Sequence, residues 1–200
     1  MIRLVFILLC SISILNAEVV TNYTIRQADT SEQIVIRMDD TIGPKEIKYT
    51  SKYIQKWTLG NNGHTLLWIY QNVSENSYIS IHSHKDYLSL SGRYRGRDVS
   101  SNVKVLNTPW IQYIDAYFPV NLFLNGITKF TYIRSRDLKP ITLTIKQRIS
   151  PNPQLYHFQA FISPLPAFLW RMDFWVDKSS YLIVKKRISG SPTLFMTKND

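Results

Sequence analysis

The stretch FTYIRSRDLKPITLTIKQRI, residues 130–149, decides the class of fold that this sequence predicts. In its second half Ile141, Leu143 and Ile145 alternate with polar residues, which is the period-two pattern of a strand that buries one face. A short polar segment, DLKP (137–140), separates this run from a similar one before it. Two alternating runs around a polar turn predict a β-hairpin.

The same pattern occurs elsewhere in the chain of 200 residues. GNNGH (60–64) lies between the runs KYIQKWTL and TLLWIYQ, and DKSS (177–180) lies between FLWRMDFWV and YLIVKKRI. Strands joined in succession by short polar turns favour an antiparallel meander. The sequence therefore predicts a mainly β fold, and it contains no internal repeat or low-complexity segment.

One segment, TPWIQYIDAYFPVNLFLNG (108–126), interrupts the alternation. Thr108 can act as an N-cap and Pro109 can occupy the first helical position, while Pro119 limits how far a helix extends. Apolar side chains follow at helical spacing: Trp110, Ile111, Ile114 and Tyr117. We therefore expect one short helix between residues 108 and 119, covering the mouth or the open side of a curved sheet.

Residues 1–17 have the pattern of a cleaved signal peptide. Arg3 supplies the positive charge, the run from Leu4 to Leu15 is mostly apolar, and Ala17 can precede the cleavage site. The apolar run is shorter than the roughly 20 residues that a membrane-spanning helix needs. We expect an exported protein in which residues 18–200 form a single β-rich domain.

Cys10 is the only cysteine of the chain. We interpret it as part of the signal peptide, with a lipid-anchored form as the alternative. Cleavage near Ala17 leaves a mature chain without disulfides, which favours a bacterial envelope protein, periplasmic or secreted, over a secreted eukaryotic domain. Two sequons for N-glycosylation, at Asn22 and Asn72, point the other way, and the sequence leaves their use open.

The chain carries 24 Lys and Arg against 14 Asp and Glu, a formal net charge of +10 at pH 7. In an exported protein this excess favours attraction to anionic lipid headgroups, lipopolysaccharide or wall polymers, and hence peripheral contact with an anionic membrane surface. A solvated basic surface that keeps the protein soluble is the alternative. Nucleic acid is not an expected partner behind a signal peptide.

His82, His84 and Asp86, in ISIHSHKDYLSL (79–90), alternate as metal ligands on one strand face would. The apolar residues change from odd to even positions across this stretch, however, and one continuous strand does not allow that change. A turn is therefore expected between His82 and Tyr87. HSHKD resembles the His-x-His-x-Asp-His motif of metallo-β-lactamase-fold hydrolases, but Tyr87 replaces the last His.

The other motifs of catalysis are absent from the sequence. It contains no Gly-x-Ser-x-Gly elbow, no His-Glu-x-x-His helix and no glycine-rich phosphate loop. We expect neither a metal site nor a cofactor, and we do not expect an enzyme. A metal-dependent hydrolase that uses His82 and His84 is the function that we rank last.

A resemblance to a known group of proteins covers the second half of the chain. The segments KFTYIRSRDLKPITLTIKQR (129–148) and YHFQAFISPLPAFLWRMDFWVDKSSYLIVKKRI (156–188) resemble the closing hairpins of lipocalin-like half-barrel envelope proteins. That group includes uncharacterised periplasmic domains and, more remotely, the LolA/LolB lipoprotein carriers. The resemblance implies a strongly curved antiparallel sheet, half-barrel or lipocalin-like, wrapped over a helix, with an apolar concavity and no defined activity.

Two sets of residues are candidates for binding a ligand in such a concavity. The aromatic candidates for its interior are Trp57, Trp68, Trp110, Phe161, Trp170 and Trp175, and the alternative for each is a place in the core. In SGRYRGRD, residues Arg93, Arg95 and Arg97 are expected on one strand face, opposite Tyr94, where they can bind phosphate or carboxylate headgroups. A solvated face that protects a sheet edge is the alternative for these arginines.

These expectations lead to one preferred function and one rival of a different class. The preferred function is non-catalytic binding of an amphipathic or lipid-like ligand, such as an anionic amphiphile, in the bacterial cell envelope. The rival is a structural or interaction protein that docks on another envelope protein through a sheet edge or the basic face. Lys185, Lys186 and Arg187 form a patch similar to that of the three arginines, but weaker.

Overall fold

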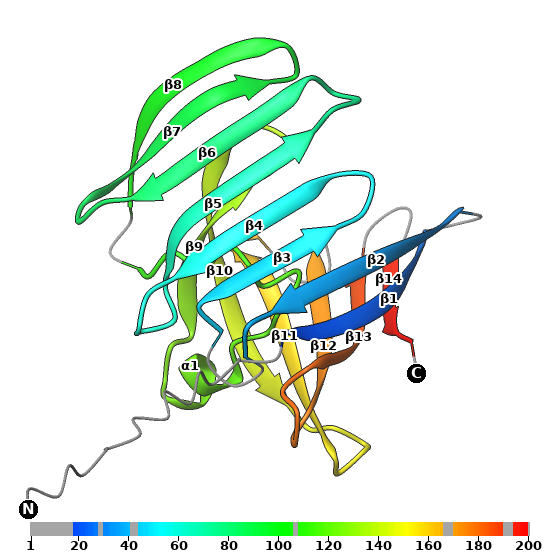
Figure 1. Cartoon of the computed structure of the whole chain (residues 1–200). Coiled ribbons are helices and arrows are strands. Elements are labelled where there is room, and N and C mark those ends of the chain that lie inside the picture. Colours follow the sequence, from blue (N-terminus) through cyan, green and yellow to red (C-terminus); the bar gives the residue numbers. More distant parts are fainter. Residues whose placement is uncertain are drawn as a thin grey trace, which may run out of the picture.

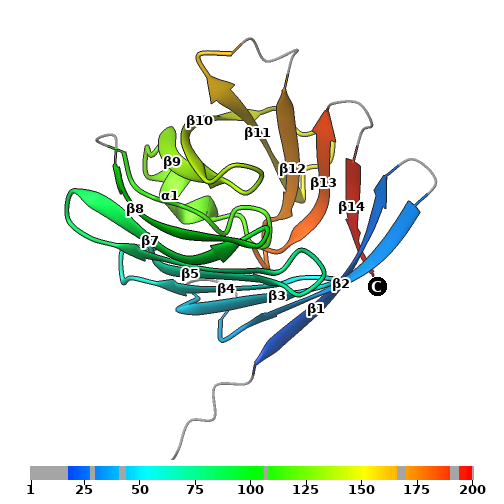
Figure 2. The ribbon, with the colours of Figure 1, turned by 90° about the horizontal axis from the view of Figure 1, so that it is seen from above.

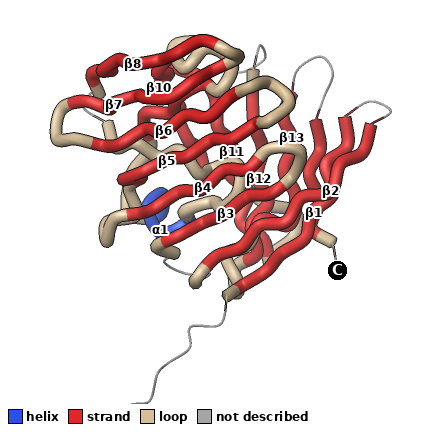
Figure 3. Tube along the Cα trace, turned by 45° about the horizontal axis from the view of Figure 1, so that its top comes forward, coloured by secondary structure: helices blue, strands red, loops and turns tan. Residues whose placement is uncertain are grey.

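The computed structural model describes residues 18–27, 30–40, 44–105, 108–165, 170–189 and 194–199. Within them the chain forms one curved antiparallel sheet of 14 strands and a single short helix (Figures 1 and 3). The prediction of a mainly β, curved antiparallel sheet with one short helix is thus confirmed. The expected signal peptide lies outside the described residues.

The strands follow one another along the chain in two groups, separated by the helix. The first group is β1 (Val19–Gln27), β2 (Thr30–Met38), β3 (Glu46–Thr50), β4 (Ile54–Leu59), β5 (Thr65–Asn72), β6 (Ser77–Ser83), β7 (Tyr87–Tyr94) and β8 (Arg97–Lys104). After α1 (Val120–Leu124) come β9 (Lys129–Arg134), β10 (Lys139–Arg148), β11 (Leu155–Ser163), β12 (Arg171–Asp177), β13 (Ile183–Ser189) and β14 (Leu194–Lys198).

The order of the strands explains how the sheet curls. It runs β8-β7-β6-β5-β4-β3-β2-β1-β14-β13-β12-β11-β10-β9, so that the first and last strands of the chain pair in the middle. The two outer strands, β8 and β9, are those that the helix-containing connection joins. Figure 2 shows the sheet curling round with α1 on its inner side. The sheet does not close into a barrel.

The three predicted hairpins are present in the structure. Each is specified by neighbouring residues, namely two alternating runs and the polar turn between them. The turn at residues 60–64 joins β4 to β5, residues 135–138 join β9 to β10, and residues 178–182 join β12 to β13. The change of parity after Ile81 is also explained, since β6 ends at Ser83 and β7 begins at Tyr87. The turn predicted between His82 and Tyr87 is confirmed.

The predicted position of the helix is wrong. We expected it between Thr108 and Pro119, whereas α1 begins at Val120, directly after Pro119. The segment before Pro119 is irregular, with one turn at 114–116, and its backbone groups bond to distant strands: Thr65 N donates to Trp110 O at 2.9 Å, and Thr131 N donates to Pro109 O at 2.8 Å. Among the described residues, no helix is long and apolar enough to cross a membrane.

The crossover segment, residues 108–128, fills the concave side of the sheet. Its buried apolar side chains are Trp110, Ile111, Tyr113, Ile114, Ala116, Tyr117, Phe118, Val120 and Phe123. The ring of Phe118 stacks on Phe158 of β11 with ring centroids 4.5 Å apart and lies 4.7 Å from the ring of Phe174 of β12. The core is therefore formed by inward-facing strand residues packed on this segment, and much of the expected apolar concavity is occupied by the chain itself.

Buried polar groups attach the crossover segment to both halves of the sheet. The Gln112 side chain, 2% exposed, accepts a hydrogen bond from Ile133 N at 2.8 Å and donates one to Ile133 O at 2.9 Å. Its backbone N donates to Thr65 Oγ1 of β5 at 2.9 Å. Three residues further along the segment, the Asp115 carboxylate pairs with the buried Lys186 ammonium of β13 at 3.2 Å. These bonds position the segment whose following residues form the pocket described below.

Candidate ligand pocket

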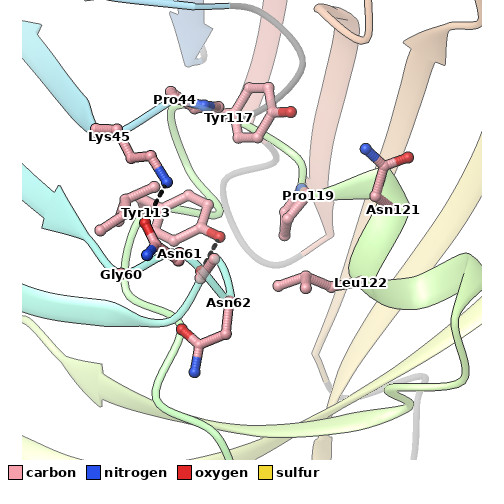
Figure 4. Close-up of a pocket in the computed structure, with 12 residues that line it drawn as sticks. Pro44, Lys45, Gly60, Asn61, Asn62, Tyr113, Tyr117, Pro119, Asn121 and Leu122 are labelled. Carbon is pink, nitrogen blue, oxygen red and sulfur yellow. Dashed lines mark hydrogen bonds between the residues drawn. The ribbon is translucent and has the colours of Figure 1, made fainter.

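A pocket of about 270 Å³ lies at one end of the sheet, where four chain segments meet (Figure 4). The connection from β2 to β3, the turn from β4 to β5, the crossover segment and α1 all contribute to its wall. The apolar part of the lining consists of Pro44, Leu59, Tyr113, Tyr117, Pro119 and Leu122. The polar side chains of the lining are Lys45, Asn61, Asn62 and Asn121. The pocket thus combines an apolar wall with a cation and three amides.

Tyr113 joins the crossover segment to the β4–β5 turn. Its hydroxyl donates to Gly63 O at 2.5 Å, and the residue is 1% exposed. Burial raises the pKa of Tyr113 far above the ordinary value of a phenol, so the hydroxyl keeps its proton and the hydrogen bond. The ring stacks on Tyr117 with centroids 6.1 Å apart and an interplanar angle of 29°. The two rings form a rigid side of the pocket.

Tyr117 is the second phenol of the pocket, and its hydroxyl is also held in the neutral form. Burial, followed by the negative charge of Asp40, raises the pKa of Tyr117 well above its ordinary value. A neutral phenol is not a nucleophile or a general base near pH 7. The two tyrosines therefore supply apolar surface and hydrogen bonds to the pocket.

Lys45 places a positive charge in the pocket. Its ammonium group donates to Asn61 Oδ1 at 2.8 Å (Figure 4). All ion pairs of the described residues involve other cations. No described carboxylate therefore lies within ion-pair distance of the Lys45 ammonium. An ammonium that donates to one amide oxygen has further N–H donors left for an anion.

The β4–β5 turn holds the other side of the pocket. Gly63 N donates to Gly60 O at 2.9 Å with a φ of +72° at Gly63, a conformation that favours glycine. A Cβ at Gly63 would lie 3.2 Å from Leu122 Cδ1, so the turn and α1 pack closely there. Asn62 Oδ1 accepts from His64 N at 3.1 Å, and its amide nitrogen lies 3.0 Å from His64 Nδ1. Burial lowers the pKa of His64, which keeps the ring neutral and lets Nδ1 accept this bond.

The tryptophans expected to line a binding site lie elsewhere. Trp57, Trp68 and Trp110 are buried in the core at 0%, 1% and 3% exposure. Trp170 is partly buried against the same core, and Trp175 stacks on His157 at 4.7 Å on the opposite face of the sheet. None of these five tryptophans lines the pocket. Trp57, Trp68 and Trp110 thus occupy the core, which was the alternative considered for them.

The prediction that Arg93, Arg95 and Arg97 share one strand face is wrong. Arg93 belongs to β7 and Arg97 to β8, and Arg95 lies in the turn between these strands with a φ of +50°. Arg93 pairs with Asp98 at 2.9 Å, and Arg95 lies 3.6 Å from Glu75. Because the strands alternate in direction, this turn lies at the end of the sheet opposite the pocket. Gly96 was the sequence signal for a turn at this place.

His82 and His84 do not meet a third ligand. His82 Nε2 lies 2.8 Å from Ser80 Oγ, and His84 Nε2 lies 2.9 Å from Ser89 Oγ. Within the described ranges there is no group of three or more His, Cys, Asp or Glu side chains that is suited to a metal ion.

The two sequons differ in their surroundings. Asn22 is exposed on β1, whereas Asn72 is 3% exposed and its amide donates to the Tyr70 hydroxyl at 3.2 Å. In the folded structure the amide of Asn72 is therefore buried and hydrogen-bonded.

Sequence reasoning missed Lys45, Asn62, Tyr113 and Leu122 as site residues. The glycines and asparagines of GNNGH were identified as a turn, but a turn does not disclose what packs on it. Tyr117 was assigned to the apolar face of a helix that does not form. The pocket arises where segments far apart in the chain meet, and no local motif indicates that meeting.

Comparisons with known proteins support the fold and leave the activity open. No protein-family model and no curated protein sequence matches the chain. The structure is similar to the crystal structure of a beta-barrel-like protein from Brucella abortus that represents a domain of unknown function, DUF1849. The two chains align with a TM-score of 0.56 and 8% sequence identity, covering 92% of this chain and 95% of the other. This chain therefore has the fold of a barrel-like domain of unknown function.

Proposed function

We propose that this protein is a non-catalytic binding protein whose ligand is a small amphipathic molecule held in the pocket beside α1. The observation that carries the proposal is the division of the pocket wall into apolar side chains and one cation, Lys45, which forms no ion pair with a carboxylate of the described residues. An apolar chain or ring can contact Leu59, Tyr113 and Leu122, and an anionic head can contact the Lys45 ammonium.

The volume of the pocket limits the size of this ligand. Pockets that bind small molecules measure roughly 300–1,000 Å³, and one water occupies about 30 Å³ in the liquid. A pocket of about 270 Å³ therefore lies just below that range. We infer a single short chain or one ring with an anionic group, rather than the two acyl chains of a phospholipid.

We place this binding in the bacterial cell envelope, because of the signal-peptide pattern of residues 1–17 and the lack of any cysteine after Cys10. Within this proposal the tryptophans of the core and the arginines of the β7–β8 turn have no contact with the ligand. The ligand-binding residues are those of the pocket.

Titration with two amphiphiles of equal chain length tests the proposal. Octanoate and octanol differ in the anionic head, and isothermal titration calorimetry measures the affinity of each for the mature protein. A charge-assisted hydrogen bond contributes about 1.5–3 kcal/mol, so Lys45→Met should weaken octanoate binding by about tenfold to a hundredfold. Binding of octanol should change little.

A blocking variant and its matched control show where the ligand binds. Asn121→Trp places a large side chain at the pocket wall, and Leu124→Trp places the same side chain three residues later on α1, outside the lining. Both positions are exposed, so both variants should fold. Asn121→Trp should abolish binding and Leu124→Trp should preserve it. Equal binding by both variants, or no binding of octanoate by the native protein, would overturn the proposal.

A further inference from the structure

The outer face of β10 to β14 and β1 carries a concentration of positive charge. We define the basic outer face by its cations, which are Arg26, Lys146, Arg148, Arg171, Lys185 and Arg187. Inward-facing neighbours on the same strands, such as Phe158, Phe174 and Met196, are buried. Because side chains alternate along a strand, the cations point away from the core. The helix α1 lies on the other, inner side of the curled sheet (Figure 2).

The strand register places these residues in two neighbouring rows. The first row follows Lys146, Gln159, Asp173, Arg187, Phe195 and Arg26, and the second follows Arg148, His157, Trp175, Lys185, Thr197 and Thr24. Each row crosses six strands. At about 4.8 Å between strands, the rows extend over roughly 24 Å.

Aromatic rings alternate with the cations on this face. Lys146 lies over Phe161 at 5.4 Å, Lys185 over Trp175 at 5.3 Å and Arg187 over Phe195 at 5.7 Å, measured to the ring centroids. Phe195 remains 38% exposed. The face thus presents positive charge and aromatic edges together, the combination that is enriched where proteins meet the headgroup region of a membrane.

Most of the charge of the face is not neutralised by carboxylates of the described residues. Asp173 is the single carboxylate of the two rows, and its side chain is 6% exposed. It already accepts hydrogen bonds from His157, Gln159 and Arg171. The other five cations form no ion pair with a carboxylate of the described residues. Their charge is available to an anionic partner.

A hollow in the basic outer face has a matching chemistry. It measures about 400 Å³ and is lined by Thr24, Arg26, Lys185, Phe195, Thr197 and Asn199. Guanidinium, ammonium and hydroxyl groups are donors for a phosphate oxyanion, and no carboxylate of the described residues lines the hollow. The exposed edge of Phe195 beside these donors suits the boundary between a headgroup and its acyl chains.

We propose that the basic outer face docks on an anionic phospholipid surface, with one lipid phosphate in the hollow between Arg26 and Lys185. Charges spread over about 24 Å fit a surface with many anionic groups better than a single free anion. The exposed edge of Phe195 among the cations favours a boundary with acyl chains over a purely ionic partner such as an inorganic polyphosphate. The site lies on the convex side of the sheet, so this docking is independent of the ligand pocket beside α1.

Vesicle flotation tests the proposal with the mature protein. The protein should float with vesicles of phosphatidylcholine mixed with phosphatidylglycerol and should not float with phosphatidylcholine alone. The double variant Arg26→Gln/Lys185→Gln should lower the partition coefficient about 30-fold, since each basic side chain near the surface contributes about fivefold. Salt should weaken the binding of the native protein.

The control removes the same charge from the opposite part of the sheet. Arg97→Gln/Lys104→Gln alters two exposed cations of β8, so its net charge equals that of the test variant. This control should lose less than about threefold, because its charges lie outside the docking face. An equal loss in both double variants would overturn the proposal, since net charge alone would then explain binding. The experiment is repeated with inorganic phosphate, RNA or additional anionic vesicles as competitors. If phosphate or RNA displaces the protein from the vesicles more strongly than the anionic lipid does, the proposal is overturned.

Discussion

Replacing Gln112 by Leu should strongly destabilise the protein. The Gln112 side chain is 2% exposed and forms three hydrogen bonds, two with the backbone of Ile133 and one with Trp110 Nε1 at 3.1 Å. Leucine has a similar volume but leaves all three partner groups without a bond in the core. A buried unsatisfied group costs about 1–3 kcal/mol, and partial relaxation makes a total of about 3–6 kcal/mol our expectation.

That loss is large against the stability of a domain. Unfolding free energies of native domains are about 5–15 kcal/mol, and 1 kcal/mol lowers the melting temperature of a protein of this size by about 2–4 °C. Urea denaturation followed by tryptophan fluorescence should therefore show a much lower midpoint, and thermal unfolding should show a melting temperature lower by roughly 6–24 °C. Hydrogen exchange at the Ile133 amide should accelerate, because Gln112 Oε1 is its acceptor.

Gln147→Leu serves as the control, since Gln147 is exposed on β10 and surface substitutions change stability by less than about 0.5 kcal/mol. A loss below 1 kcal/mol in Gln112→Leu, with unchanged exchange at Ile133, would falsify the view that this glutamine holds the crossover segment to the sheet.

Two further predictions concern a close backbone contact and the β4–β5 turn. Gly92→Ala should destabilise the protein by more than about 3 kcal/mol, because φ is +125° and an added Cβ would overlap the backbone carbonyl oxygen of Tyr78. Gly96→Ala in the adjacent turn, where an added Cβ would meet only Asn76 Nδ2 at 3.9 Å, should cost only about 1–2 kcal/mol in urea denaturation. Similar losses in both would contradict the steric explanation. Burial lowers the pKa of His64, so the unfolded chain binds the proton more readily and the native state should lose stability as the pH falls through 6.5 toward that lowered pKa. Chemical denaturation between pH 7 and pH 5 should show this slope in the native protein and a weaker one in His64→Gln, and identical slopes would exclude His64 as its source.

The hairpins could be predicted from the sequence because their information is local. Side chains of a strand alternate between two faces, so Ile141, Leu143 and Ile145 indicate both the strand and its buried face within a few residues. The same rule located the turn between His82 and Tyr87, since a change of parity cannot occur in a continuous strand.

The tertiary structure decided the conformation of the crossover segment and the place of the binding pocket. Thr108 and Pro109 resemble a helix start, but the backbone after them bonds to Thr65 and Thr131, which lie more than one strand away along the chain. Those partners lie beside this segment only in the folded sheet, where β5 and β9 contact it. The local helix propensity is then overridden by long-range hydrogen bonds in the core.

The candidate site shows the same limit. Lys45, Asn62 and Leu122 come from three segments, and nothing in the spacing of these residues indicates that they share one pocket. The sequence by itself determined that the chain forms antiparallel hairpins, because alternation and turn chemistry act between neighbours. Which sheet edges the crossover joins, and therefore which side chains meet beside α1, depends on the order of fourteen described strands, and that order follows from packing of the whole chain.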